Sequence, residues 1–213
     1  FGIAISSDDK TLFIADSGAG YDPNNPGTGA EPDMLGQVLS MPTAGGTPVA
    51  LTGTTGFRPK GIEIFRKDNA DTIYFSGYNA SDGKAGVFSV GPDGGGLTPL
   101  TTGGPLTDPG GVTVARDGTV YVVNTTATVG GTAEVFKVAG GSAASVVAGI
   151  KVGYPAGLAV SQDGNTLLIS GQDRDLNTTV VHRYDLASST LGQTNMGIEN
   201  NTDAGGLHRA KGG

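Results

Sequence analysis

Cysteine is absent from the 213-residue chain, and histidine occurs only twice. Without cysteine the protein can form no disulfide, no thiolate metal site and no cysteine nucleophile. Two histidines also leave little material for a Ser-His-Asp arrangement. These absences argue against nucleophilic catalysis, and we assign no catalytic residue and no resident cofactor from the sequence.

Positive charge is also scarce. Thirteen Lys and Arg residues face 20 Asp and Glu residues, which gives a net charge of −7, and no basic cluster occurs. Such a surface repels a phosphate backbone. No segment approaches the roughly 18 consecutive apolar residues that a membrane-spanning helix needs. We therefore expect neither a nucleic-acid partner nor a transmembrane segment.

The remaining composition bears on location and fold class. The chain begins at Phe1 without a methionine or a leader, so we expect either processing or a longer parent protein. Thr, Ser, Asn and Gly stand where cytosolic proteins usually carry Lys and Glu, which favours an extracytoplasmic protein: secreted, periplasmic or on the cell surface. The 38 glycines and 11 prolines, set between regular apolar segments, indicate many tight turns and an all-β fold.

A two-part phrase occurs four times along the chain. Alternating apolar residues are followed by an Asp-containing turn and then by a Thr that starts a nearly all-apolar segment. The copies are FGIAISSDDKTLFIADS from Phe1, PKGIEIFRKDNADTIYFSGY from Pro59, PGGVTVARDGTVYVVNT from Pro109 and PAGLAVSQDGNTLLISGQ from Pro155. Each copy predicts two strands and a turn, with the second strand buried on both faces.

Two further strands follow the phrase. A third strand is predicted in every repeat, at 37–41, 86–90, 133–138 and 179–184. A shorter fourth strand is evident in at least three repeats, beginning near Thr47, Leu97 and Ala144. Each repeat is therefore a four-stranded unit.

The spacing of the repeats indicates the architecture. The glycines that open the first strands, at positions 2, 61, 111, 157 and 206, lie 59, 50, 46 and 49 residues apart. Four strands in about 50 residues are typical of a β-propeller blade, whereas the coils of a β-solenoid are usually shorter. We predict an all-β propeller forming a single domain over 1–213. Its blades are predicted at about 1–58, 59–108, 109–154 and 155–202, and 203–213 would start a fifth.

Propellers usually close their ring by combining strands from both termini in one blade, which removes exposed strand edges. Here no terminal strand is available to complete the fifth blade. Further blades, from this chain or another, are therefore expected.

The phrases PxGIAIS, DG-T-hydrophobic and YVADS-like strand ends resemble blades of the NHL and gluconolactonase-like six-bladed propellers. The resemblance covers nearly the whole chain and implies a ring of six blades. In the gluconolactonase and senescence-marker relatives it implies a divalent metal held by several blades, with an Asn and an Asp directly before the opening glycine. Streptogramin-lyase-like relatives place a His there. The matching positions in this chain hold Phe1, Lys60, Gly110, Ala156 and Gly205, none of which is a ligand of that kind.

Ligand-binding residues are expected at the mouth of the propeller channel, where loops from several blades converge. The predicted set is Asp16, Lys60, Tyr78, Asn124 and Gln172. Four of these lie at the ends of second strands, and Lys60 precedes an opening glycine. The alternative interpretation of Asp16 and Asn124 is that they bond the backbone where a strand turns into its loop.

Three other groups of residues carry weaker signals. The loop from Gly18 to Gly36 offers Asp22, Glu31 and Asp33 as a possible calcium site, but it lacks the EF-hand pattern and is more simply a solvated loop. Asp173 and Asp175 around Arg174 are expected to form a surface charge cluster.

Glu63 and His208 occupy equivalent positions in their repeats. Two ionisable groups in an otherwise small column suggest catalysis, although nothing in the sequence shows that they meet. His182 is expected to be partly exposed on a third strand.

Three functional interpretations remain open. The preferred one is a non-catalytic platform whose loops bind a protein or a glycan. The second is a metal-dependent lactonase, hydrolase or lyase of the gluconolactonase-like type, with its ligands in blades outside this sequence. The third is a structural subunit of an extracellular assembly.

Overall fold

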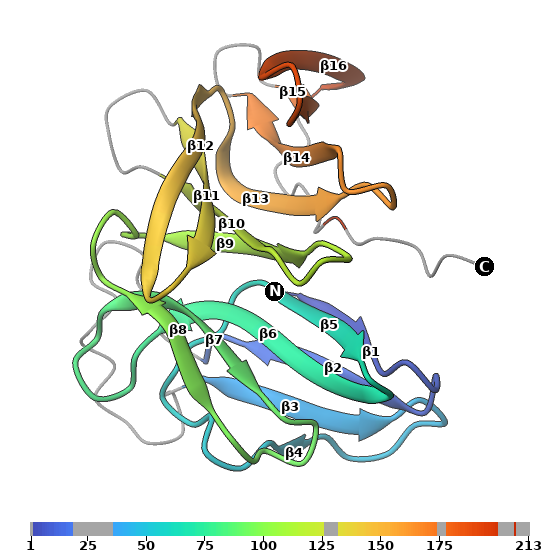
Figure 1. Ribbon diagram of the computed structural model, residues 1–213. Helices are drawn as coiled ribbons and strands as arrows, with labels where there is room; N and C mark the ends of the chain where they lie inside the picture. The colour runs from blue at the N-terminus through green and yellow to red at the C-terminus, as the bar shows by residue number, and fades with distance from the viewer. Residues whose placement is uncertain (1, 19–35, 126–131, 174–177, 200–206, 208–213) are drawn as a thin grey trace.

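The computed structural model describes residues 2–18, 36–125, 132–173, 178–199 and Leu207. These residues form strands and turns (Figure 1). The strands are β1 (Ile3–Ile5), β2 (Thr11–Asp16), β3 (Gln37–Pro42), β4 (Val49–Ala50), β5 (Ile62–Lys67), β6 (Ala70–Tyr78), β7 (Ala85–Val90), β8 (Thr98–Thr102), β9 (Pro109–Val114), β10 (Val120–Thr125), β11 (Ala133–Ala139), β12 (Ser142–Ile150), β13 (Gly153–Val160), β14 (Thr166–Asp173), β15 (Thr178–Asp185) and β16 (Thr190–Glu199). Within this part of the chain there is no helix long and apolar enough to cross a membrane.

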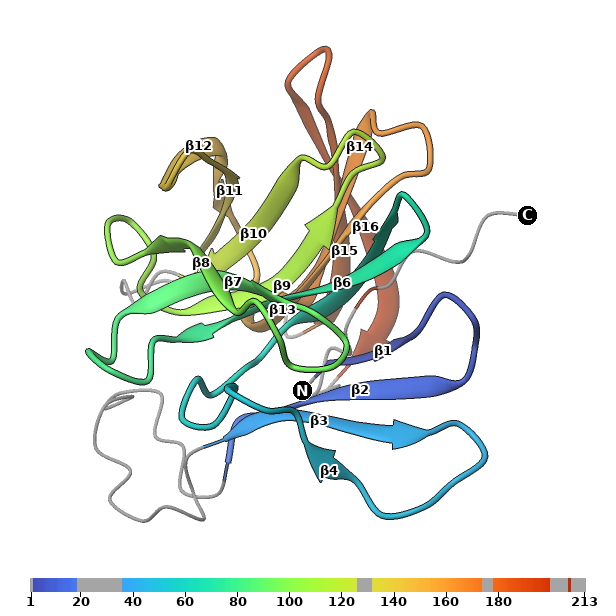
Figure 2. The same ribbon diagram turned by 60° about the horizontal axis from the view of Figure 1, so that its bottom comes forward.

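The strands form four antiparallel sheets, each built from four strands in chain order. The sheets follow one another around an arc from β1–β4 to β13–β16 (Figure 1), and β4 and β12 lie at its periphery while β9 and β13 lie near its middle (Figure 2). The predicted all-β propeller with four four-stranded blades is confirmed. Apart from Leu207, the predicted start of a fifth blade at 203–213 lies outside the described residues.

The fourth strand of the last blade was the least evident in the sequence. It is β16, which pairs with β15 in antiparallel register from Asp185 opposite Thr190 to Thr178 opposite Glu199. Its sequence, TLGQTNMGIE, lacks the apolar alternation of the other strands. β16 is therefore defined by its pairing with the long strand β15 and not by an apolar pattern of its own.

The Asp-containing turns between the first and second strands of blades 1, 3 and 4 are held by their own side chains. Asp8 Oδ1 accepts hydrogen bonds from Ser6 Oγ at 2.7 Å and from Lys10 N at 3.2 Å. Asp163 Oδ1 repeats the arrangement in blade 4, where Ser161 Oγ donates at 2.6 Å. These hydrogen bonds lower the pKa of both exposed carboxyls, with the serine hydroxyl as the main cause. In blades 1 and 4 the turn is therefore a local structure that the hairpin forms with its own side chains.

The hydrophobic core is divided between neighbouring blades. Among the described residues, one cluster joins blades 1 and 2, a second joins blades 2 and 3, and a third joins blades 3 and 4. The first is rich in aromatic rings, since Phe57 makes edge contacts with Phe75 and Phe88 at centroid distances of 6.0 and 5.0 Å. The largest fully buried side chains all belong to these clusters: Phe13, Phe75, Phe88, Ile62, Ile73, Ile150, Leu158, Leu167, Ile169, Val38, Val87 and Val90.

The second strands of blades 2 and 3, β6 and β10, each contribute to two of these clusters because their blades have a described blade on either side. All residues of β10 except Thr125 are buried, as predicted for a strand covered on both faces. In β2 only Phe13 and Ala15 are buried, and they face blade 2. The other face of blade 1 has no described blade against it, which accounts for the difference.

Glycine at the start of the inner strands allows the blades to approach each other closely. A Cβ atom on Gly61 would clash with the carbonyl oxygen of Gly110 and would lie 2.9 Å from the Cα of Gly111. One on Gly2 would lie 2.9 Å from Ile62 Cγ2 and 3.1 Å from Ile62 N. These glycines are thus required by backbone contact between blades and not by a turn conformation.

We predict that Gly61→Ala lowers the free energy of unfolding by about 3 kcal/mol, because the backbone of blade 3 must move to accept the methyl group. The matched control is Gly192→Ala on β16, where the nearest atom to an added Cβ is Arg183 O at 3.8 Å. Its effect should stay within about 0.5 kcal/mol. Urea denaturation followed by circular dichroism measures both, and equal losses would show that the close approach at Gly61 carries no special cost.

Candidate functional site

The predicted site residues lie at one end of the blades because each first strand begins where its antiparallel second strand ends. The register of β9 and β10 illustrates this, since Pro109 lies opposite Asn124. Lys60 precedes β5, Tyr78 ends β6, and Asn124 is the penultimate residue of β10. This loop end therefore collects residues from blades 2 and 3 around their shared boundary.

Lys60 and Asp108 form an ion pair across that boundary. Lys60 Nζ binds Asp108 Oδ1, and only 8% of the lysine side chain is exposed. Tyr78 Oη donates to the same carboxylate oxygen at 3.1 Å, and the lysine ammonium lies 5.6 Å from the centre of the tyrosine ring. The Asp108 carboxylate, directly before the first strand of blade 3, is thus bound by two side chains of blade 2.

Burial and a neighbouring charge act in opposite directions on the pKa of Lys60. Removal from water lowers the pKa of Lys60 below its ordinary value, and the neighbouring Asp108 carboxylate opposes part of that shift. The compact ammonium of Lys acts as a point charge that can contact a single carboxylate oxygen while lying over an aromatic ring. The arrangement suits a buried structural contact between blades.

Asn124 holds the loop that carries Asp108. Its side chain is fully buried, and its Oδ1 accepts hydrogen bonds from Thr107 N and Asp108 N, both at 2.9 Å. Asp16 acts similarly at the equivalent strand end, where its Oδ1 accepts from Gly18 N at 3.0 Å. Both side chains adopt the backbone-bonding role that the sequence offered as the alternative to ligand binding.

Serine hydroxyls make two further connections between blades at this end. Ser17 Oγ donates to Pro59 O at 2.8 Å, which ties the end of blade 1 to the start of blade 2. Ser76 Oγ donates to Gly110 O and accepts from Gly61 N at 2.9 Å. The boundary between blades 1 and 2 and the boundary between blades 2 and 3 therefore each contain a serine hydrogen bond close to the opening glycine of the following blade.

The structure brings together three of the five predicted residues, Lys60, Tyr78 and Asn124, through Asp108. Asp16 lies on blade 1 and Gln172 on β14 in blade 4, and the bonds of this cluster include neither. Sequence reasoning missed Asp108 because it lies two residues before Gly110, the position that aligns with Lys60. The position of Asp108 directly before a repeat boundary was the feature from which its role could have been predicted.

In the described part of the chain, no group of three His, Asp or Glu side chains is placed to hold a metal ion. The calcium candidates Asp22, Glu31 and Asp33 lie outside the described residues. Phe1 and Gly205, two members of the column that holds metal ligands in the resembled families, also lie outside them.

Two expectations about ionisable residues in blade 4 are wrong. His182 is 3% exposed, not partly exposed, and Asp173 is 3% exposed, not part of a surface cluster. His182 lies opposite Ile169 and Asp173 opposite Thr178, so both share the face of blade 4 that packs on blade 3. Burial lowers the pKa of His182, against smaller opposing effects of a Lys151 backbone group and the charge of Asp173.

Glu63 is also buried, at 6% exposed, but it lies on β5 in blade 2. His208, its equivalent in the repeat, lies outside the described residues, as do Arg174 and Asp175.

We predict that Asp108→Asn lowers the free energy of unfolding by about 3 kcal/mol, because the Lys60 ammonium loses its charged partner inside the protein. Adding Lys60→Met to that variant should restore most of the loss, since the buried charge is then gone. The control is Asp82→Asn, whose partner Lys84 is 62% exposed at 3.2 Å. It should change stability by less than about 1 kcal/mol. A double variant no more stable than Asp108→Asn alone would contradict this view of the pair.

Comparisons with known proteins were made for sequence and structure. No family model matches the sequence, and a comparison with curated proteins finds no match either. Solved structures do match over almost the whole chain. A chain of a nidogen/laminin complex is 21% identical with a TM-score of 0.58, over 97% of this chain and 63% of the other.

Two bacterial proteins are similar in the same way. TolB from Acinetobacter baumannii is 10% identical with a TM-score of 0.62, over 92% of this chain and 43% of the other. A putative 6-phosphogluconolactonase from Bacteroides uniformis is 18% identical with a TM-score of 0.54, over 96% and 56%. The chain thus spans between 43% and 63% of the lengths of these three neighbours. At such identities the likeness shows the fold alone, and the chain has the fold of a β-propeller.

Proposed function

We propose that the chain is a non-catalytic β-propeller platform, located outside the cytoplasm, that binds a protein or a glycan through the loops at the Lys60 end. The observation that carries this proposal is the set of contacts that the polar residues at this end make. Lys60, Tyr78, Asp108, Asn124 and Ser17 all engage in bonds that fasten one blade to the next or hold a loop. They build a rigid frame and leave the exposed loops as the surface available to a partner.

One of those loops is 79–84, which joins β6 and β7 beside Tyr78. Asn79 Oδ1 accepts hydrogen bonds from Ser81 N at 2.9 Å and Ser81 Oγ at 2.8 Å, and Asp82 Oδ1 accepts from Lys84 N at 3.0 Å. The loop is exposed, polar and held in one conformation by its own side chains. An ordered polar loop on a rigid scaffold suits recognition of a polar partner surface, because little conformational entropy is lost on binding.

The uncovered face of blade 1 supports a second element of the proposal, namely that another propeller blade packs there. On β1, Ala4 faces blade 2, whereas Ile3 and Ile5 face away and are 54% and 39% exposed. The equivalent residues of blade 2 are Ile62 and Ile64, which pack against blade 1. Blade 1 therefore presents to solvent the apolar face that blade 2 buries.

Strand register extends this face beyond β1. Ile14 lies opposite Ile3, and Leu12 lies opposite Ile5. Leu39 and Met41 of β3 continue the same face. A contiguous apolar sheet face of this kind is typical of an interface, and its match to the blade 2 surface supports another propeller blade as the occupant.

We expect the purified chain to bind a hydrophobic dye such as ANS through this face. The double variant Ile3→Thr/Ile5→Thr should reduce dye fluorescence, and self-association in sedimentation velocity, much more than Val49→Thr. Val49 is a suitable control because it is 62% exposed on the short outer strand β4. Equal small effects of both variants would show that the face is covered in solution and would remove the need for another blade.

A second candidate function is a metal-dependent lactonase or lyase. The likeness to a putative 6-phosphogluconolactonase favours it. Its metal ligands would have to come from outside the described residues. The hydrogen bonds and the ion pair at the Lys60 end hold blades and loops together and take no part in such a reaction. The platform is therefore the better supported function.

The platform proposal predicts no turnover of aldonolactones, 6-phosphogluconolactone or oligogalacturonate above the uncatalysed rate, with Ca²⁺, Mg²⁺ or Mn²⁺ or with EDTA. These cations at millimolar concentration should shift Tm by less than about 1 °C, because a ligand stabilises only the native state that binds it. Metal-dependent turnover, or a shift of several degrees, would establish the second candidate instead.

A binding measurement tests the platform proposal directly. The protein is applied to a glycan array and to a panel of extracellular matrix proteins. Binding of a defined partner should be lost in Asp82→Lys and kept in Asp93→Lys. Both aspartates are exposed and accept a hydrogen bond from the backbone N–H two residues on, but Asp93 lies at the opposite end of the blade. Equal effects of the two variants would exclude the 79–84 loop as the binding surface.

A further inference from the structure

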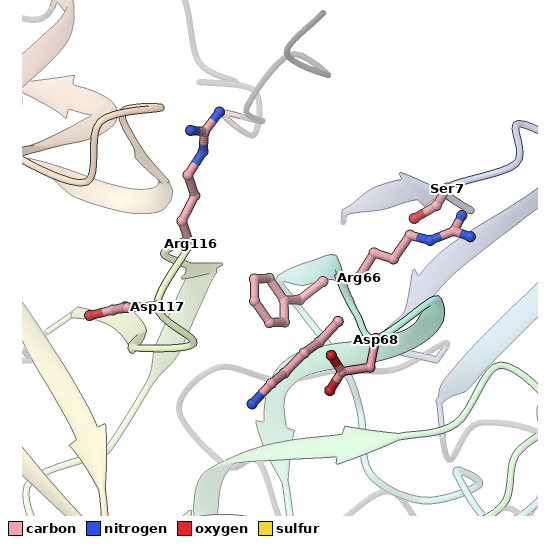
Figure 3. Close-up of a pocket in the computed structure, with 7 residues that line it drawn as sticks. Ser7, Arg66, Asp68, Arg116 and Asp117 are labelled. Atoms are coloured by element: carbon pink, nitrogen blue, oxygen red, sulfur yellow. The ribbon is translucent and has the colours of Figure 1, made fainter.

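The ionisable side chains at the end of the blades opposite to Lys60 are in contact with water. Arg66, Asp68, Arg116 and Asp117 are exposed around an open hollow, and the charged ends of Arg66 and Arg116 point away from one another (Figure 3). Because water solvates these charges, they need no partner inside the protein. His182 on β15 is the opposite case, since its side chain is 3% exposed.

His182 lies inside the boundary between blades 3 and 4. It is opposite Ile169 of β14, and Val180 and Tyr184 precede and follow it on the same face of β15. All three of these neighbours belong to the apolar cluster that blade 4 shares with blade 3. The histidine therefore occupies a position in the apolar contact between the two blades.

Both ring nitrogens of His182 are buried and have no hydrogen-bond partner among the described residues. A neutral imidazole carries one donor and one acceptor, whereas a protonated imidazole carries two donors and a full charge. Burying a charge without a partner costs far more free energy than burying an unpaired polar atom. The closed boundary therefore tolerates the neutral ring and disfavours the charged one.

Asp173 is the carboxylate that shares this face of blade 4, but it does not contact the ring directly in the strand register. The opposed pair Gly171 and Val180 lies between Asp173 and His182. Gly171 packs tightly on blade 3, where an added Cβ would lie 2.7 Å from Val152 Cβ. Burial lowers the pKa of the histidine, and the opposing effect of the Asp173 charge is smaller.

The other titratable groups on the described faces of this boundary do not offset a positive charge on the ring. They are Tyr121 of β10 and Tyr184 of β15 in the apolar cluster, Lys137 of β11, which alternates with Val135 of that cluster, and Lys151 after β12. The strand β12, SAASVVAGI, contains no titratable residue. Tyrosine does not ionise in mildly acidic solution, and both lysines carry the same charge as a protonated histidine.

Blade 4 has one described neighbour, because its residues occur in a single one of the three described clusters. The polar contacts across the boundary include Tyr184 Oη, which donates to Val146 O at 3.2 Å, and Val160 N, which donates to Thr113 Oγ1 at 3.3 Å. Neither contact involves a charged group. Opening of this boundary would therefore leave the clusters between blades 1 and 2 and between blades 2 and 3 in place.

We propose that the boundary between blades 3 and 4 is a pH-sensitive contact, in which protonation of His182 in mildly acidic solution separates blade 4 from blade 3 and leaves blades 1 to 3 folded. When the boundary opens, the ring enters water and takes up a proton as the pH falls through about 6.5, whereas the enclosed ring takes one up only at lower pH. The opened state then binds more protons, so acid favours opening and the boundary is most stable above about pH 7. This proposal does not depend on the partner binding proposed for the Lys60 end.

Hydrogen exchange of the whole chain at pH 7 and pH 5, measured by mass spectrometry and corrected for the intrinsic effect of pH on exchange, tests the proposal. The opening constant of blade 4, reported by peptides that cover 178–186, should rise severalfold at pH 5. The upper limit is roughly 25-fold, for a ring that ionises only in the opened state with a pKa of about 6.5. Peptides that cover 72–78 in blade 2 should change by less than about twofold.

Variants connect the response to the histidine. His182→Phe and His182→Met remove the titrating group and keep a side chain of similar size in the boundary, and two substitutions guard against loss of folding in either one. In both variants the opening constant of blade 4 should change by less than about twofold between pH 7 and pH 5. The control is His208→Gln, which removes the other histidine of the chain and should keep the full response.

A titration followed by nuclear magnetic resonance needs no change in the core. His208→Gln leaves His182 as the one imidazole of the chain, so ¹⁵N-labelled histidine reports on it alone. In the native state its titration midpoint should lie below about 6.5, the value for a solvated ring.

Four results would overturn the proposal: a midpoint at or above about 6.5, an equal loss of protection in blades 2 and 4, an undiminished response in both His182 variants, or loss of the response in His208→Gln. The second result would show acid unfolding of the whole propeller in place of a boundary that opens. A response that is confined to blade 4 and removed by substitution of His182 supports the proposal.

Discussion

Close backbone contact between neighbouring inner strands is the constraint on which the rest of the structure depends. At Gly61 the strand that opens blade 2 lies directly against Gly110 and Gly111 of blade 3, with no room for a side chain. This contact sets the spacing at the centre of the arc. The wider space farther out is filled by the side chains of the second and third strands, which form the apolar clusters between blades.

The polar bonds of the loop end follow from the same contact. Once two inner strands touch, the residues just before them lie close to the ends of the adjacent second strands, so Lys60 meets Asp108 and Ser17 meets Pro59. Because these groups are removed from water, each needs a partner, and the neighbouring blade supplies it. The opposite end has different chemistry, since its turns satisfy their own backbone groups through Asp8, Asp117 and Asp163.

Repetition made the fold predictable from sequence, because a pattern seen four times outweighs the uncertainty of any single copy. The all-β class, the four-stranded blades and the Asp-containing turns were predicted in this way. Features that depend on the neighbouring blade were not. Asp108 as the partner of Lys60, the burial of His182 and Asp173, and the pairing of β16 all arise from contacts across blades or from a strand without an apolar pattern.

Placement of the cores between blades has a consequence for cooperativity. Blades 2 and 3 each contribute to two of the described clusters, whereas blade 1 contributes to one. The arc therefore resembles a one-dimensional array in which each unit is stabilised by its nearest neighbours. In such an array the terminal units open at a lower free energy than the central ones. The boundary between blades 2 and 3, which holds the contact of Lys60 with Asp108, lies in the interior of the described array, where local opening is most costly.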